Sequence, residues 1–444
     1  MRVALLAAVC SAVAGQTRGR EFTYLSYDEI VSELYTLEEK FPDVMHVTTA
    51  NAAYGIGTYG MCGEEACEIH IVRVTNAATF SKDKERPEIY FSGELHGDER
   101  VGPIASLEFI RLLVTEYNKD PWITRLVDTR AVYLTPMTNA HGYYHKQRRE
   151  GVVDVNRDFP IDDPENGCMR SIAARAINEL FRDHLFQISV TFHGGIDLIG
   201  YVWGTASTYY SNHNSPDAKS LDMLGSTMSA YGGKVDNANY PHGPMNQVIY
   251  PVRGGMEDWS YATSWNSKHS RSSCKKVDGY KSSRTKYKSK DLRVLTFLVE
   301  TSKSKAPSEE TLGSDEGLFD PQGAGQGHVP RNVRLMLFLT DIVQPYVHIV
   351  SVDGANRSIS WEVGGSIFVD ETYIKYQYKT SAGRKQRKIS EKLSGSTRWG
   401  PSKSEEVAKH QAGLDIDLDA NTVNRKLHPF VSAFEMQVSL PPGA

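Results

Sequence analysis

The chain of 444 residues has no dominant charge, no long apolar run and no motif for serine or phosphate chemistry. Its 50 basic and 54 acidic residues nearly cancel, so the overall charge does not predict nucleic acid or an anionic membrane as a partner. No internal apolar stretch reaches the roughly 20 residues of a membrane-spanning helix. There is no Gly-x-Ser-x-Gly elbow and no phosphate-binding glycine loop, so a serine hydrolase or nucleotide site is not expected.

The N-terminus has the three parts of a secretory signal peptide. Arg2 is followed by apolar residues at 3–9 and by the small-residue exit at 12–14. We therefore predict a signal peptide over residues 1–14 and a mature chain that is secreted or held in the lumen of the secretory pathway. The alternative interpretation is a buried N-terminal helix.

Cysteine is scarce: only five are present, and Cys10 lies in the predicted signal peptide. In an oxidising compartment, four remaining cysteines predict two disulfides, for which three pairings are open. Cys62 and Cys67 could close a small loop that contains glycines, which would leave Cys168 to pair with Cys274. The alternatives are free thiols or a zinc site. The zinc site is discounted, because a lone C-x4-C pair makes a poor structural zinc site.

The most informative stretch is 92–102, Ser-Gly-Glu-Leu-His-Gly-Asp-Glu-Arg-Val-Gly. An apolar strand candidate at 89–91 precedes it, and a helical apolar pattern follows it. His96 and Glu99 therefore lie three residues apart at a strand-to-helix corner. Imidazole nitrogen and carboxylate oxygen are ligands that Zn²⁺ accepts, and a catalytic zinc needs one further protein ligand. The pattern H-x-x-E is common by chance, so this stretch alone does not establish a metal site.

Strand and helix patterns alternate through the first three quarters of the chain. Strand-like runs lie at 69–74, 89–91, 131–134, 188–192 and 294–299, and helical patterns include 24–41 and 170–184. Such alternation predicts an α/β fold with a mixed, largely parallel sheet flanked by helices on both faces. Ligands in such sheets collect beyond the strand ends.

The pattern changes after an apolar helix candidate at 334–346. Period-two runs at 349–352, 359–363, 373–378 and near 430–440 predict a small C-terminal β-sandwich over 347–444, with a loop near 384–410. The only N-glycosylation sequon, at Asn356, lies in this segment. The region 265–290 is basic and has no apolar period, which is typical of an exposed loop. The alternative is a surface that guides acidic substrates.

Four further clusters stand at or near predicted strand ends. Asn156 and Arg157 follow a basic turn with Arg148 and Arg149, and an amide beside a guanidinium is suited to bind a carboxylate. His193 ends a strand and is followed by two glycines. Tyr250 precedes a glycine-rich turn, and Glu300 ends the run at 294–299. Taken alone, the pair of Asn156 and Arg157 is more typical of a surface ion-pair cluster, and a lone histidine such as His193 is more often only hydrogen-bonded.

Together, these motifs resemble the M14 family of zinc metallocarboxypeptidases over about residues 22–346. The matching pieces, in order, are H-G-D-E at 96–99, an altered N-P-D-G-Y turn at 136–143, D-V-N-R-D-F-P at 154–160, F-H-G-G at 192–195, a tyrosine with G-G-M-E-D-W at 250–259, and V-E-T-S at 299–302. The resemblance predicts a catalytic domain at 22–346 that acts as a monomer on the C-termini of peptides or proteins, with no nucleic acid as a partner.

The resemblance also implies a role for each residue. One zinc ion would be held by His96, Glu99 and His193, and Glu300 would be the general base. The terminal carboxylate of the substrate would be bound by Asn156, Arg157 and Tyr250. The scissile carbonyl would be polarised by Arg148 or, alternatively, by Arg149. The alternatives are an M14-type amidohydrolase on a non-standard amide and an inactive, carboxypeptidase-like binding protein.

The sequence departs from the pancreatic-type members of the family at Asp98, where those enzymes carry arginine. In this respect it resembles the regulatory, N/E-type branch more closely. The position that sets specificity in the family falls near Glu257, with Asp236 in a region that can also line the pocket. Two acids there would favour a C-terminal Lys or Arg.

Overall fold

The computed structural model describes residues 19–83, 85–161, 167–205, 214–262, 274, 279–285, 294–353, 358–367, 372–379, 386–393 and 431–437. The predicted signal peptide, the Asn356 sequon and most of the basic region 265–290 lie outside these residues. Within the described ranges, no helix has both the length and the apolar character needed to cross a membrane.

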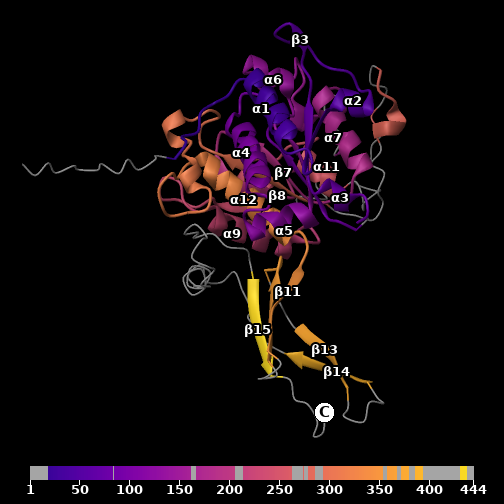
Figure 1. The fold of residues 1–444 in the computed structure, drawn as a ribbon. Helices are drawn as coiled ribbons and strands as arrows, with labels where there is room; N and C mark the ends of the chain where they lie inside the picture. Colours follow the sequence, from indigo (N-terminus) through magenta and orange to yellow (C-terminus); the bar gives the residue numbers. More distant parts are fainter. Residues whose placement is uncertain are drawn as a thin grey trace, which may run out of the picture.

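An eight-stranded mixed sheet forms the centre of the main body, in the order β1-β4-β6-β5-β7-β10-β8-β9 (Figure 1). The four central strands run parallel, and β4 and β8 flank them in the antiparallel direction. The strands are β1 Met45–Thr49, β4 His70–Val74, β5 Glu88–Ser92, β6 Ala131–Thr135, β7 Phe186–His193, β8 Asp197–Tyr201, β9 His242–Pro244 and β10 Leu295–Thr301. A small hairpin, β2 Met61–Cys62 with β3 Glu65–Ala66, lies apart from this sheet.

Helices cover both sides of this sheet (Figure 1). On one side α4 packs against α1, α5 and α12, and α12 also contacts α9; on the other side lie α2, α7 and α11. The helices are α1 Tyr27–Lys40, α2 Ala50–Tyr54, α3 Ala77–Phe80, α4 Val101–Glu116, α5 Pro121–Thr129, α6 Ala140–His145, α7 Ile172–Asp183, α9 Ala218–Gly232, α10 Met245–Val248, α11 Met256–Ala262 and α12 His328–Ile342. The short 3₁₀ turns are η1 Val155–Arg157, η2 Ser282–Thr285, η3 Glu309–Thr311 and η4 Asp315–Gly317.

The predicted α/β class is confirmed. The sheet is stabilised by the burial of its central strands between the two layers of helices. All residues of β6 and nearly all of β5 and β7 are buried, as expected for strands covered on both faces. The first helix begins with a capping box in which Ser26 and Glu29 bond to each other's backbone, and its apolar stripe faces the core.

Some elements differ from the sequence prediction. The helix expected at 334–346 is α12, which begins six residues earlier. Its first turns contain His328, Arg331 and Asn332, which are buried although they are polar or charged; Arg331 donates to Asp197 at 2.7 Å. Strands β1, β8 and β9 were not predicted, because they are short or carry few apolar residues in a period of two.

The C-terminal segment extends from one end of the main body, beyond α5 and α9 (Figure 1). It contains β11 Tyr346–Asp353, β12 Ser358–Gly364 and β15 Val431–Gln437 in one antiparallel sheet, and β13 Thr372–Lys379 with β14 Gln386–Leu393 in another. The prediction of a loop at 384–410 was wrong for β14, whose polar and charged residues gave no apolar alternation. That the two sheets form a sandwich stays a prediction, as do the predicted domain boundaries.

Two disulfides are present, between Cys62 and Cys67 and between Cys168 and Cys274. The first closes the hairpin of β2 and β3. The second joins the segment before α7 to a point 106 residues further along the chain. This is one of the three pairings that the sequence left open.

Removing the long-range disulfide is expected to cost much more stability than removing the short one. In the chain-entropy model, closing a loop of 106 residues is worth about 5 kcal/mol, but a separation of 5 residues only about 2 kcal/mol. The double variant C168S/C274S should therefore unfold at a markedly lower temperature than C62S/C67S in the same thermal melt. Equal melting temperatures for the two variants would contradict this assignment of their roles.

Candidate functional site

The candidate site lies where three neighbouring parallel strands end. Strand β5 leads into the turn that carries His96 and Glu99, β7 ends at His193, and β10 places Glu300 directly opposite His193 in the strand register. Because parallel strands point the same way, their carboxyl ends meet at one edge of the sheet. Residues more than 200 positions apart in the sequence are thereby brought together.

The turn after β5 can approach its neighbours closely because of Gly97. A β-carbon at this position would lie 1.9 Å from the carbonyl carbon of Gly142 in α6. The absence of a side chain therefore lets the backbone between His96 and Glu99 pack directly on α6. This contact holds the two side chains against the rest of the site.

His96, Glu99 and His193 form a compact, buried cluster. Glu99 Oε1 lies 3.0 Å from His96 Nδ1, and Glu99 Oε2 lies 2.9 Å from His193 Nδ1. The two Nδ1 atoms are 3.1 Å apart. In the described part of the chain, this is the one group of three or more such side chains whose ligand atoms all lie within 4.8 Å of one another.

The donors and the charges of this cluster fit a zinc ion. Two imidazole nitrogens and one carboxylate are the ligand set of many catalytic zinc sites. Burial opposes protonation of His193, but the carboxylates of Glu257 and Glu99 outweigh it and raise the pKa of His193. Burial likewise opposes ionisation of Glu99, yet the two histidines lower the pKa of Glu99. The site therefore favours a positive charge between its ligands.

A second carboxylate orients His96. The Nε2 atom of His96 lies 3.1 Å from Asp154 Oδ1, and the Nδ1 atom of His96 is therefore directed toward Glu99. A carboxylate behind a metal-binding histidine fixes the ring and its tautomer. Burial opposes ionisation of Asp154, but His96 and Arg148 outweigh it, so the pKa of Asp154 is lowered.

Of the two candidate arginines, Arg148 lies next to the cluster of His96, Glu99 and His193. Its Nε donates to Asp154 at 3.0 Å, and its Nη1 lies 3.4 Å from Glu99 Oε1. The neighbouring Arg149 instead directs Nη1 to the backbone oxygen of Val152. The structure thus places the guanidinium of Arg148 beside the predicted metal ligands.

The segment that carries Asp154, Asn156 and Arg157 is attached at both ends to the start of α7. Glu150 accepts from the backbone N–H groups of Ile172 and Ala173 at 2.6 and 3.0 Å. Asp158 accepts from the backbone of Arg170 and Ser171 and from the Ser171 hydroxyl. These two buried carboxylates hold the residues between them in a fixed position.

Burial raises the pKa of Glu150 to about 7 and that of Asp158 to about 6. The folded chain therefore holds these protons more tightly than the unfolded chain, in which the carboxyls have ordinary pKa values. The contribution of Glu150 to stability is complete below its ordinary pKa of 4.5 and is lost as the pH rises through 7.

Glu150→Gln is thus expected to flatten the pH dependence of stability. The stability of the native chain relative to E150Q should fall by up to about 1.4 kcal/mol per pH unit between pH 4.5 and 7. Thermal or urea unfolding of both proteins across this range measures the difference. If the free energies of unfolding of the two proteins changed with pH in parallel, Glu150 would not titrate in this interval.

Glu300 is the acid nearest in register to His193. Burial raises its pKa, and its charge interacts with His193, His96 and Glu99. Among the described residues, no side chain or backbone group bonds to Glu300 Oε2, although that atom is buried. A buried carboxylate oxygen without a protein partner beside the metal ligands is available to accept a proton from a bound molecule.

Asn156 and Tyr250 differ in how firmly the fold holds them. Asn156 is buried and accepts from the backbone N–H of Met256 at 2.8 Å. Arg157 donates to the backbone oxygen of Asn156 at 2.7 Å. Tyr250 is 56% exposed and close enough to interact electrostatically with Arg148. An exposed tyrosine such as Tyr250 can move toward a ligand without disturbing the core.

Glu257, which the family resemblance placed near the specificity pocket, is buried next to His193. It lies in the first turn of α11 and is 1% exposed. Its carboxylate accepts from Thr191 and contacts Asn156 and His193. Asp236 lies in an exposed turn at 235–238, where its charge acts on His328.

Sequence reasoning missed Lys305. This residue donates to Asp98 at 2.7 Å and lies 3.9 Å from Glu99 Oε1. Its loop follows β10, and the backbone oxygen of Lys305 accepts from Arg100 at 2.8 Å. The residue stands in a segment, 303–330, that had no pattern beyond serine, glycine and proline, so no sequence signal pointed to it.

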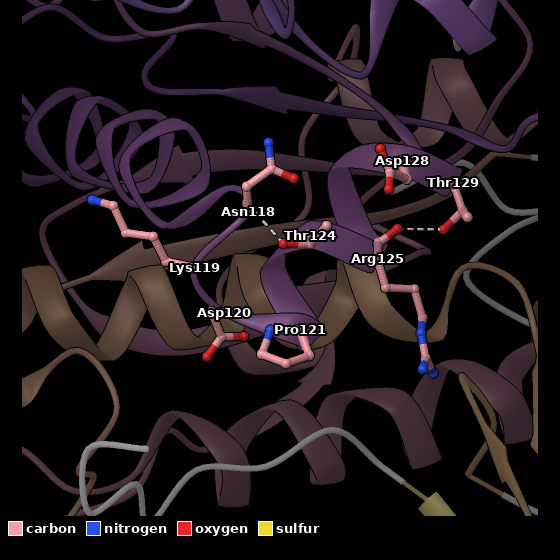
Figure 2. A pocket seen from close by; sticks show the side chains of 8 residues that line it. All are labelled: Asn118, Lys119, Asp120, Pro121, Thr124, Arg125, Asp128 and Thr129. Carbon is pink, nitrogen blue, oxygen red and sulfur yellow. Dashed lines mark hydrogen bonds between the residues drawn. The ribbon is translucent and has the colours of Figure 1, made fainter. Parts of the chain in front are cut away.

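A separate pocket of about 510 Å³ lies at the start of α5. Figure 2 shows the side chains that line it. Its lining residues are Asn118, Lys119, Asp120, Pro121, Thr124, Arg125, Asp128 and Thr129. None of them is a candidate site residue. Arg125 also lies over the ring of Tyr346, 4.3 Å from its centre, so this region belongs to the junction with the C-terminal strands.

Comparisons with known proteins identify the family of the chain. The family model described as zinc carboxypeptidase, Peptidase M14, matches residues 30–292, more than half of the chain. Mouse carboxypeptidase M is 29% identical over 197 residues, which cover 39% of this chain and 44% of that protein. Mouse carboxypeptidase A4 is 20% identical over 280 residues, 56% of this chain and 62% of that protein. The chain thus spans less than two thirds of the length of these relatives.

Two solved structures share the fold. Carboxypeptidase A from Helicoverpa armigera has a TM-score of 0.51 and 17% identity, covering 71% of this chain and 72% of its own. The thrombin activatable fibrinolysis inhibitor has a TM-score of 0.50 and 16% identity, covering 72% and 73%. Family model, fold and the cluster of His96, Glu99 and His193 lead to one conclusion: the chain belongs to the zinc carboxypeptidase family M14.

Proposed function

We propose that the chain is a zinc metallocarboxypeptidase, which hydrolyses the last peptide bond of peptides or proteins. The observation that carries this proposal is the buried cluster of His96, Glu99 and His193, with Glu300 beside it, whose Oε2 has no hydrogen-bond partner among the described residues. The metal is zinc, the metal of the family to which the chain belongs. When bound, zinc supplies a water of lowered pKa and stabilises negative charge on oxygen.

The protein's own residues account for proton transfer and charge. Glu300 is the general base in this proposal: its free oxygen takes a proton from the attacking water and passes it to the leaving amine. Burial raises the pKa of Glu300, which suits it to hold that proton transiently. Arg148 lies beside the metal ligands and donates to the oxyanion that forms from the scissile carbonyl.

A grip on the terminal carboxylate would restrict cleavage to the chain end. In this proposal, Arg157 and Asn156 bind the terminal carboxylate, and the exposed Tyr250 moves over it. An internal peptide bond presents no carboxylate at this position. A C-terminal amide also lacks the charge, so it should bind poorly.

The proposal also covers the branch of the family and the location of the protein. Asp98 in place of arginine supports a closer relation to the regulatory branch, although both carboxypeptidase M and carboxypeptidase A4 are relatives. The two disulfides support a secreted or secretory-pathway location.

A preference for C-terminal Lys or Arg stays a prediction. The carboxylate of Glu257 points into the protein interior, which argues against this acid as the cause of such a preference. A monomeric state and the lack of a nucleic acid partner also stay predictions.

Two alternative functions make predictions that differ from those of a carboxypeptidase. An M14-type amidohydrolase on a non-standard amide would not need the grip of Asn156 and Arg157 on a terminal carboxylate. An inactive binding protein would not need Glu300, which the chain retains together with all three ligands.

Paired peptides test the proposal directly. Each peptide is prepared with a free C-terminal carboxylate and as its C-terminal amide, and release of the last residue is measured. We expect release from the free acid and little from the amide, and Arg157→Ala should weaken binding of the acid far more than that of the amide. Equal cleavage of both forms, or cleavage within the chain, would contradict an exopeptidase.

A further inference from the structure

The buried carboxylate of Glu257 lies behind His193, on the side away from the other metal ligands. His193 Nδ1 faces Glu99 at 2.9 Å, whereas His193 Nε2 lies 3.7 Å from Glu257 Oε1. Both side chains are almost completely buried, at 3% and 1% exposure. The contact is therefore screened little by solvent, and at this distance it is an electrostatic contact rather than a short hydrogen bond.

Two neighbours fix the position of this carboxylate. Thr191 on β7 donates its hydroxyl to Glu257 Oε1. Asn156 Nδ2 lies 3.3 Å from both carboxylate oxygens. The orientation of the Asn156 amide is itself set, because its oxygen accepts from the backbone N–H of Met256. Glu257 is thus held from β7 and from the 154–158 segment.

The arrangement calls for an acid at this position. If His193 holds the metal through Nδ1, its Nε2 carries a hydrogen and is a donor. Asn156 Nδ2 is also a donor and lies 3.3 Å from that nitrogen. Two buried donors that face each other need a nearby acceptor, and Glu257 supplies it: its oxygens accept from Asn156 Nδ2, and Oε1 lies 3.7 Å from His193 Nε2. An amide at this position would offer one acceptor oxygen in place of two.

The pair of Glu257 and His193 repeats the arrangement of Asp154 and His96. In both pairs Nδ1 faces the ligand cluster and Nε2 faces a carboxylate. Such carboxylates hold the ring in place and make the metal-bound nitrogen more basic, which strengthens metal binding. We propose that Glu257 is a positioning residue that orients His193, and with it Asn156, rather than an acid that selects a basic substrate side chain.

This inference rests on the proposed metallocarboxypeptidase function and has a consequence for specificity. The Glu257 oxygens are engaged by Thr191, Asn156 and His193 and are shielded from solvent. A substrate Lys or Arg could reach them only by displacing these contacts, at the cost of leaving buried donors unpaired. The C-terminal side-chain preference is therefore expected to be insensitive to residue 257.

Metal affinity tests the proposal independently of activity. Zinc dissociation constants are measured by competition with a chromogenic chelator for the native protein, E257Q and E257L. We expect affinity to fall by about 10- to 100-fold, more for E257L, which has no acceptor. The Co²⁺-substituted variants should show a shifted visible spectrum, because the His193 ring is no longer held in one orientation. Glu179→Gln serves as the control, since this buried glutamate bonds to Tyr280 and Arg284.

The outcomes separate this inference from the proposed function. Native zinc affinity and an unchanged Co²⁺ spectrum in both variants, with a changed preference for C-terminal Lys or Arg, would overturn the positioning role. A loss of affinity equal to that of E179Q, with the same fall in metal-free melting temperature, would also overturn it. Absence of zinc binding in the native protein would instead contradict the proposed function itself.

Discussion

Glu300→Gln is expected to lower kcat by about 100- to 10,000-fold while zinc remains bound with native affinity. The carboxamide has nearly the same size as the carboxylate, so the fold should tolerate it. It cannot, however, accept a proton from water and return it to the leaving amine. Because Glu300 Oε2 has no hydrogen-bond partner among the described residues, the substitution removes no bond to that oxygen.

The control for this prediction is again Glu179→Gln, which alters a buried glutamate that is not part of the proposed site. Its kcat should be close to native. Steady-state kinetics on one free-acid peptide, with zinc content measured on the same samples, give the comparison. Near-native kcat in E300Q with zinc bound would exclude Glu300 as the base and would point to another acid near the metal.

His193→Ala is expected to remove both zinc binding and peptidase activity. The substitution leaves two of the three ligands, so its effect on zinc affinity should exceed the 10- to 100-fold range of residues that only support a ligand. Native protein should also be stabilised by zinc, by about 4 kcal/mol when free zinc is 1,000 times the dissociation constant. The variant should show no such gain.

Zinc content and thermal melting with and without added zinc measure this effect. The comparison with E257Q and E257L is informative, because these variants keep all three ligands and should bind zinc more weakly without losing it. A His193→Ala protein with stoichiometric zinc and a native zinc-dependent rise in melting temperature would contradict the ligand assignment.

The sequence predicted the centre of the fold better than its edges. The runs at 89–91, 131–134 and 188–192 are apolar because both faces of β5, β6 and β7 are buried, and this signal is readable without a structure. Strand β14 carries Lys, Arg and Glu and showed no such signal. The start of α12 was missed because Arg331 and Asn332 are buried through specific partners that the sequence does not reveal.

The candidate site shows the same division. His96 and Glu99 follow the end of β5, and His193 and Glu300 lie at the ends of β7 and β10, so parallel topology brings them to one edge of the sheet. The choice between Arg148 and Arg149, the direction of Glu257 and the presence of Lys305 depend on side-chain orientation and on loops. Spacing along the chain does not specify these features, since they arise from contacts between segments far apart in the sequence.

The most direct test of the central proposal is zinc-dependent release of C-terminal residues from a peptide panel. Peptides ending in Lys, Arg, Phe, Leu and Glu are incubated with the native protein, with the chelator-treated protein and with the treated protein after zinc is restored. The proposal predicts one zinc per chain, release of only the last residue, loss of release on chelation and recovery with zinc. Stoichiometric zinc with no release from any peptide would contradict it and would favour a different amide substrate or a binding role.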